Sequence, residues 1–126
     1  MTGTTPTLCG QVAVVTGASR GIGAATARAL GAQGASVVLA ARDERALADL
    51  ADELLAAGGQ ALAVPTDVTD DAAVRALIDS AVGRYGRLDV AVNNAADSGG
   101  RPTSLADVDI ADFDRACAVG LRGVFL

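Results

Sequence analysis

An eight-residue stretch, Thr16 to Gly23, constrains the fold of this chain more than any other part of it. It reads Thr-Gly-Ala-Ser-Arg-Gly-Ile-Gly. A short apolar run, Val12 to Val15, precedes it, and an alanine-rich helical pattern begins at Ile22. A strand, a glycine turn and a helix in this order place backbone N–H groups and a helix N-terminus against a phosphate. The stretch therefore predicts a nucleotide site, and an ordinary glycine turn is the alternative.

The three glycines of this stretch each have a steric reason to be there. Gly17 allows a sharp turn, Gly21 lets the backbone approach a pyrophosphate, and Gly23 lets the helix and the strand pack closely. The spacing is Gly-x-x-x-Gly-x-Gly, which differs from the general dinucleotide fingerprint Gly-x-Gly-x-x-Gly.

Apolar runs alternate with helical patterns along the whole chain, which is typical of βα units and a parallel sheet. We therefore expect an α/β fold: a Rossmann-type doubly wound parallel sheet with strand order 3-2-1-4. The chain would hold its N-terminal portion, up to the start of a fourth helix. The predicted strands are residues 12–16, 36–41, 60–65 and 88–93. The predicted helices are 21–33, one capped by Asp43 that runs through Ala57, one from Asp70 or Asp71, and one from Asp109 or Ala111.

Three of these helices show apolar stripes that should pack against the sheet. In the second helix the stripe is Leu47, Leu50, Ala51 and Leu54. In the third it is Val74, Leu77, Ile78, Ala81 and Val82, and Tyr85 at its end should also pack. In the last it is Phe113, Cys117, Leu121 and Val124.

Composition narrows the class of function. A chain of 126 residues is at most one domain, which we place at residues 8–126, with residues 1–7 as a disordered leader. The net charge of −5 argues against nucleic acid and anionic membranes as partners. No apolar run approaches membrane-spanning length, so we expect a soluble, cytoplasmic protein. Cys9 and Cys117 are expected to be free thiols in the core, and no metal site is expected.

The sequence around the glycines resembles the cofactor loop of the short-chain dehydrogenase/reductase family, Thr-Gly-x-x-x-Gly-x-Gly. Further matches extend the resemblance from about Leu8 to Leu126, so that the chain would be a dinucleotide-binding domain that is incomplete at its C-terminus. The resemblance implies hydride transfer between a nicotinamide cofactor and a carbonyl or secondary alcohol, and homo-oligomers among complete members. In the loop it assigns cofactor contacts to Gly17, Ser19, Arg20, Gly21, Ile22 and Gly23.

The end of the second predicted strand bears on which dinucleotide fits. An acidic residue there binds the ribose hydroxyls of NAD, whereas an arginine accepts the extra phosphate of NADP. In the resembled family, Ala41 stands where the acidic residue is usual, and Arg20 and Arg42 stand where NADP-preferring members carry basic residues. Guanidinium pairs well with phosphate, so NADP(H) is favoured and NAD(H) stays possible. The alternative is that Arg42 is a solvated residue at a helix start, partly neutralised by Asp43.

Two motifs after later strands extend the resemblance. Asp67 and Val68 match a pair that touches the adenine ring in the family, although an aspartate there can also be a helix cap. The run Asn93-Asn94-Ala95-Ala96 resembles Asn-Asn-Ala-Gly, which stabilises the sheet centre and lines the nicotinamide ribose side. We therefore assign Asn94 and Ala95 to the cofactor site.

The catalytic residues of the resembled family are not matched. Gly120 stands where the family has an asparagine, so either a water replaces that amide or the step is lost. The sequence has no histidine and no lysine, and Tyr85 is followed at the fourth place by Asp89, so the family's Tyr-x-x-x-Lys pair is missing. Two hypotheses follow: the cofactor-binding portion of an NADP(H)-preferring reductase that acts on a small carbonyl or alcohol, or a non-catalytic, degenerate nucleotide-binding module. A methyltransferase of similar architecture is a distant third, since it would want an acidic residue near Ala41.

Overall fold

The computed structural model describes residues 5–97 and 103–126. Its centre is a parallel sheet of four strands in the order β3-β2-β1-β4, which confirms the predicted fold class and strand order. Residues 1–4, which are part of the predicted leader, and residues 98–102 lie outside the described ranges. The strands are β1 Val12–Thr16, β2 Ser36–Ala41, β3 Gln60–Pro65 and β4 Val90–Val92.

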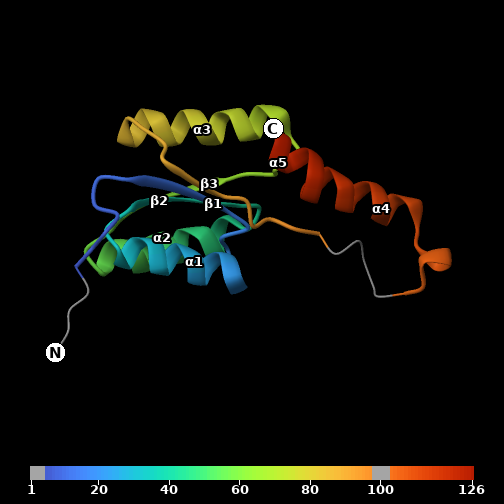
Figure 1. Ribbon diagram of the computed structural model, residues 1–126, viewed down its shortest axis with the longest axis horizontal. Coiled ribbons are helices and arrows are strands. Elements are labelled where there is room, and N and C mark those ends of the chain that lie inside the picture. Colours follow the sequence, from blue (N-terminus) through green and yellow to red (C-terminus); the bar gives the residue numbers. More distant parts are fainter. Residues whose placement is uncertain (1–4, 98–102) are drawn as a thin grey trace.

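Helices cover both faces of the sheet (Figure 1). Two of them, α1 (Gly21–Ala32) and α2 (Glu44–Ala56), pack on one face, and α3 (Asp71–Tyr85) packs on the other. Both faces of β1 and β2 are therefore buried, as their continuous apolar runs require. On the first face the core includes Val15, Val37, Leu39, Leu47, Leu50 and Leu54. On the second it includes Val12, Val14, Val38, Leu77 and Ala81, with Tyr85 packed against it as predicted.

Aspartate caps start three of the helices at the positions expected from the sequence. The carboxylates of Asp43, Asp70 and Asp109 each accept a hydrogen bond of 3.0 Å from a backbone N–H in the first turn of α2, α3 and α4 (Ile110–Cys117). Such a cap satisfies N–H groups that have no partner within the helix. No side chain caps α1.

The strand β4 is shorter than the predicted residues 88–93. It pairs with β1 only opposite Ala13, Val14 and Val15. Before the strand, Asp89 binds Val12 twice: its N–H donates to the Val12 carbonyl at 2.9 Å, and its carboxylate accepts a hydrogen bond of 2.8 Å from the Val12 N–H. The length of β4 is thus decided by its partner strand.

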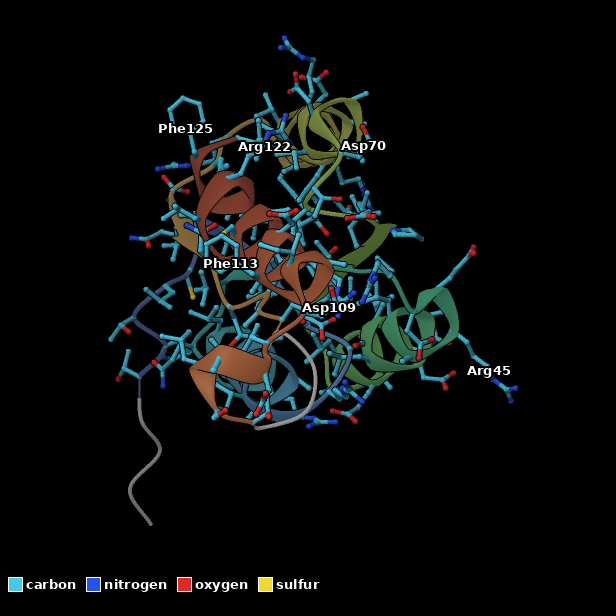
Figure 2. The ribbon with its side chains drawn as sticks, turned by 90° about the vertical axis from the view of Figure 1, so that its right-hand side faces the viewer. Arg45, Asp70, Asp109, Phe113, Arg122 and Phe125 are labelled. Atoms are coloured by element: carbon cyan, nitrogen blue, oxygen red, sulfur yellow. The ribbon has the colours of Figure 1, made fainter. Side chains whose placement is uncertain are left out.

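The last helical region leaves the sheet. After a short turn, η1 (Leu105–Asp107), it consists of α4, the π-helical η2 (Ala118–Arg122) and α5 (Gly123–Phe125). Figure 1 shows it projecting sideways, with only its end beside α3, and Figure 2 shows Phe125 pointing away from the molecule. Phe113, Leu121 and Val124 are 56%, 73% and 49% exposed, so the prediction that they face inward is wrong.

Two smaller predictions about burial are also corrected. In α3, Leu77 and Ala81 are buried, but Ile78 and Val82 lie at the surface, because the buried stripe is narrower than the apolar spacing suggests. Cys9 and Cys117 are free, as predicted, yet Cys9 is exposed and Cys117 is half-buried. Among the described helices, none has the length and apolar character needed to cross a bilayer.

Candidate functional site

A cavity of about 680 Å³ opens at the carboxyl ends of the four strands. In open α/β sheets this is the edge at which ligands bind. All of the predicted cofactor residues line it except Gly23, which is buried beneath the glycine turn. The predicted residues on its wall are Gly17, Ser19, Arg20, Gly21, Ile22, Arg42, Asp67, Val68, Asn94 and Ala95.

The glycine turn is packed so tightly that two of its residues leave no room for a side chain. Gly17 has a φ of +64°, which L side chains rarely adopt, and a Cβ there would lie 2.9 Å from Asn94 Nδ2. A Cβ on Gly23 would collide with the carbonyl oxygen of Gly17 and lie 2.7 Å from the same amide nitrogen. The sharp turn and the close helix packing expected from the sequence are therefore present.

The start of α1 faces this cavity without a side-chain cap. Arg20 precedes the helix in an extended conformation, and its side chain makes no capping hydrogen bond. The first N–H groups of a helix have no partner inside it, and the helix dipole adds positive potential at the same end. Of the four described helices that have eight or more residues, α2, α3 and α4 are each capped by an aspartate, whereas the start of α1 is open to an anion.

Hydrogen bonds join the turns after β1 and β4. The Thr16 hydroxyl oxygen accepts from the N–H groups of Asn94 at 3.1 Å and Ala95 at 3.0 Å. The Asn94 side-chain amide donates to the Gly17 carbonyl at 3.2 Å. The asparagine motif thus holds two turns together and at the same time places Ala95 and Ala96 on the cavity wall.

Asp67 belongs to a tight turn after β3. Its Oδ1 accepts from the Thr69 hydroxyl at 2.7 Å and the Thr69 N–H at 2.9 Å. These hydrogen bonds hold the pKa of the Asp67 carboxyl below its ordinary value, burial opposes them, and the charge of Arg42 acts in the same direction as the bonds. Asp70 caps α3, so Asp67 does not serve as the helix cap that the sequence allowed as its alternative role.

Two guanidinium groups lie at the edge of the same cavity. Arg20 and Arg42 are exposed, and within residues 5–97 and 103–126 neither has a carboxylate at ion-pair distance. The carboxylate of Asp43 is engaged as the cap of α2. Ala41, at the end of β2, offers no acidic side chain. This edge of the cavity is therefore suited to a phosphate.

Part of the wall was missed by sequence reasoning. Arg115 forms an ion pair with Asp97, with Nε 2.8 Å from Oδ2, and a second one with Asp112. Arg115 and Val119 stand four residues apart, a spacing that marks one helix face but not what this face meets. The wall residues that sequence reasoning did not assign to the site are Thr66, Thr69, Asp97, Arg115 and Val119.

Gly120 and Tyr85 are both absent from the cavity wall. Gly120 lies in the π-helical η2, so the helix is distorted at the place where the resembled family has its asparagine, and a Cβ there would meet nothing within 4 Å. Burial raises the pKa of the hydroxyl of Tyr85, the last residue of α3, whose partly buried side chain packs against the core. Within the described ranges, no group of acidic or cysteine side chains is arranged to hold a metal ion.

Comparisons with known proteins agree with this geometry. The family model for short chain dehydrogenases matches residues 11–126. Among curated relatives, (5R,7aS)-5-hydroxy-7a-methyl-1-oxo-2,3,5,6,7,7a-hexahydro-1H-indene-carboxyl-CoA reductase from Mycobacterium tuberculosis is 49% identical over 120 residues, which cover 94% of this chain and 45% of the relative. The chain spans about half the length of the curated relatives it matches.

Two solved structures show the same fold. A 3-ketoacyl-(acyl-carrier-protein) reductase from Brucella melitensis, complexed with NADH, has a TM-score of 0.88 and 37% identity, over 95% of this chain and 48% of that one. A short chain dehydrogenase/reductase from Burkholderia phymatum, in complex with NAD, has a TM-score of 0.88 and 38% identity, over 94% of this chain and 41% of that one.

Proposed function

Because this chain belongs to the short chain dehydrogenase family of oxidoreductases, we propose that it binds a nicotinamide dinucleotide in the cavity described above, with NADP(H) preferred over NAD(H). It would form the cofactor-binding part of an enzyme that transfers hydride between the nicotinamide and a small carbonyl or secondary alcohol. The observation that carries the proposal is one cavity that gathers the uncapped start of α1, two arginines and the Asp67 turn.

The residues present fit such a cofactor. The cavity volume of about 680 Å³ falls in the range of small-molecule sites. The N–H groups at the start of α1 would bind the diphosphate, since they have no other cap. Asp67 and Val68 would meet the adenine ring, and Asn94 and Ala95 the nicotinamide ribose side. When bound, the nicotinamide supplies or accepts the hydride.

The preference for NADP(H) rests on this chain's own side chains. The two solved neighbours carry NADH and NAD, which supports a nicotinamide dinucleotide but not its phosphorylated form. Here Ala41 offers no carboxylate to the ribose hydroxyls, and Arg20 and Arg42 stand beside the cavity with no ion pair to another described residue. A charge-assisted hydrogen bond contributes about 1.5–3 kcal/mol, so one such bond to a phosphate gives about a 10- to 150-fold preference.

Calorimetric titration of the chain with NADPH and NADH tests the proposal. The wild type should bind NADPH at least about tenfold more tightly, and the double variant Arg20→Met, Arg42→Met should lose most of this preference. Its affinity for NADH should stay within about twofold, because NADH lacks the additional ribose phosphate that the arginines are proposed to bind. Arg45→Met is the matched control, since Arg45 on α2 points into solvent in Figure 2. A wild-type chain that binds neither nucleotide contradicts the whole proposal, and one that prefers NADH contradicts the phosphate assignment.

A second candidate is a nucleotide-binding module without catalysis. Gly120 favours it, because this residue has no side chain in the place of the resembled family's asparagine. A stable monomer that binds NADPH tightly favours the module. Aggregation through the exposed side of β4 favours the dehydrogenase part, because an unpaired strand edge recruits other chains. The expected cytoplasmic location and homo-oligomeric state stay predictions.

A further inference from the structure

Besides lining the candidate site with Arg115 and Val119, the last helical region contacts the turn of residues 67–69 between β3 and α3. The Arg122 guanidinium, through Nη1, donates a hydrogen bond of 2.9 Å to the Thr69 carbonyl, 53 residues away in the sequence. Figure 1 shows α5 beside the start of α3, and Figure 2 shows Arg122 on the side of its helix that faces Asp70, the cap of α3. Arg122 therefore joins two segments that are otherwise far apart in the chain.

A close backbone approach accompanies this hydrogen bond. A Cβ built on Gly123 would lie 3.1 Å from the Val68 carbonyl oxygen and 3.2 Å from Val68 Cγ2. Such distances are tighter than ordinary van der Waals contacts, so a side chain there would force the turn and the helix apart. The helix reaches the turn this closely because residue 123 is a glycine.

The turn is thus held from two sides. Inside it, Asp67 accepts both hydrogen bonds of Thr69, and outside it Arg122 holds the Thr69 carbonyl. Asp67, Val68 and Thr69 all line the cavity. Arg122 does not line it and acts on the cavity only through the turn.

We propose that Arg122 is a positioning residue for the adenine side of the candidate site. By binding the Thr69 carbonyl, it keeps the 67–69 turn in the orientation in which Asp67 and Val68 meet the adenine ring. A turn that is ordered before the ligand arrives has less conformational freedom to lose on binding, so the ligand binds more tightly. This inference rests on the proposed function, since it presupposes a dinucleotide in the cavity.

A positioning role confined to this turn affects one half of the dinucleotide. Arg122→Met should weaken the binding of NADPH and of adenosine 2′,5′-bisphosphate by the same factor, about fivefold, the loss expected for one hydrogen bond. The reduced nicotinamide mononucleotide, which lacks adenine, should bind with unchanged affinity in an NMR titration. Arg122→Lys keeps a donor and should restore part of the affinity. Arg45→Met, with its side chain in solvent, should leave all three affinities unchanged.

A pair of glycine variants separates positioning from helix stability. Gly120→Ala and Gly123→Ala each replace a glycine in the same helical region, and alanine favours a helix by about 1 kcal/mol over glycine. A Cβ at Gly120 meets nothing within 4 Å, whereas a Cβ at Gly123 meets Val68. We expect Gly123→Ala to weaken the binding of adenosine 2′,5′-bisphosphate by about threefold or more, and Gly120→Ala to leave its affinity unchanged.

The outcomes distinguish this inference from the function on which it rests. A wild-type chain that binds no NADPH overturns both. If the wild type binds NADPH and Arg122→Met binds adenosine 2′,5′-bisphosphate with an affinity within twofold of the wild type, the positioning role is overturned. The proposed function then still stands. An equal loss of affinity for the reduced nicotinamide mononucleotide also overturns the role, because Arg122 would then affect both halves of the dinucleotide. If Arg122→Met does not fold, the Gly120 and Gly123 pair decides the question: equal affinities overturn the role, and a loss at Gly123 alone supports it.

Discussion

The central strand β2 carries a continuous apolar run and the last helical region carries an apolar stripe, yet the two regions bury these residues very differently. Leu39 in β2 has no exposed surface, whereas Phe113, Leu121 and Phe125 are 56%, 73% and 87% exposed. The strand lies between two layers of helices, while the apolar face of α4 and α5 meets no comparable surface among residues 5–97 and 103–126. Regular spacing therefore identifies a face, but burial requires a second surface that fits it.

The same contrast separates two walls of the candidate site. The wall at the glycine turn is fixed by backbone packing that leaves no space for a Cβ at Gly17 or Gly23. The wall on the helical side is attached by the Arg115–Asp97 ion pair, the Arg122 hydrogen bond and the approach at Gly123. Local opening costs least where few apolar contacts are buried, so hydrogen exchange should be faster on the helical side.

The largest expected effect tests burial directly. Leu39→Ala should lower the free energy of unfolding by about 3 kcal/mol, because it leaves a cavity in a fully buried position. Leu121→Ala removes the same atoms from an exposed position and should change the free energy of unfolding by less than about 0.5 kcal/mol. Urea unfolding of the two variants gives both values. Similar losses of unfolding free energy would mean that the apolar face of the last helical region is covered in solution, and the contrast with β2 would not hold.

The next effect sharpens the comparison at the glycine turn. Gly23→Ala should destabilise the chain by about 2 kcal/mol, because its methyl group would overlap the Gly17 carbonyl and crowd Asn94. Gly83→Ala is the matched control: it lies in α3, its Cβ would meet nothing within 4 Å, and alanine suits a helix better by about 0.5–1 kcal/mol. Thermal unfolding should therefore show a lower midpoint for the first variant and an equal or higher one for the second.

The smallest effect concerns the pH dependence of stability. The pKa of Asp67 lies below its ordinary value of 3.8 in the folded chain, so the folded state favours the ionised carboxylate. This contribution is complete above about pH 4 and is lost as the pH falls through the lower folded pKa. Asp67→Asn should remove it. Unfolding midpoints of the wild type and the variant should therefore converge as the pH is lowered below about 4, and a constant difference would show that the Thr69 hydrogen bonds do not depend on the charge.

Local features of this chain were predictable because they depend on near neighbours. The caps Asp43, Asp70 and Asp109 each act within their own helical turn, so their role follows from a few residues of sequence. The bounds of β1 were found because an uninterrupted apolar run ends at a glycine turn. The cofactor residues that the family resemblance assigned gather at one cavity because strand ends meet at one edge of a parallel sheet.

Features that depend on distant partners were not predictable in this way. The shortness of β4 follows from its register with β1, which pairs only Val90, Ala91 and Val92 with that strand. The place of Arg115 on the cavity wall depends on its ion pair with Asp97, 18 residues earlier in the chain. Neither pairing leaves a signal in the local pattern of apolar and polar residues.

The sequence by itself determined the alternation of strands and helices, the glycine turn and the arginines beside it, because propensity, caps and steric limits act over a few residues. The tertiary structure decided which apolar faces are covered and how the last helix meets the 67–69 turn. These outcomes depend on surfaces from segments far apart in the chain, such as Arg122 and Thr69, and a contact of this kind exists only once both segments are in place.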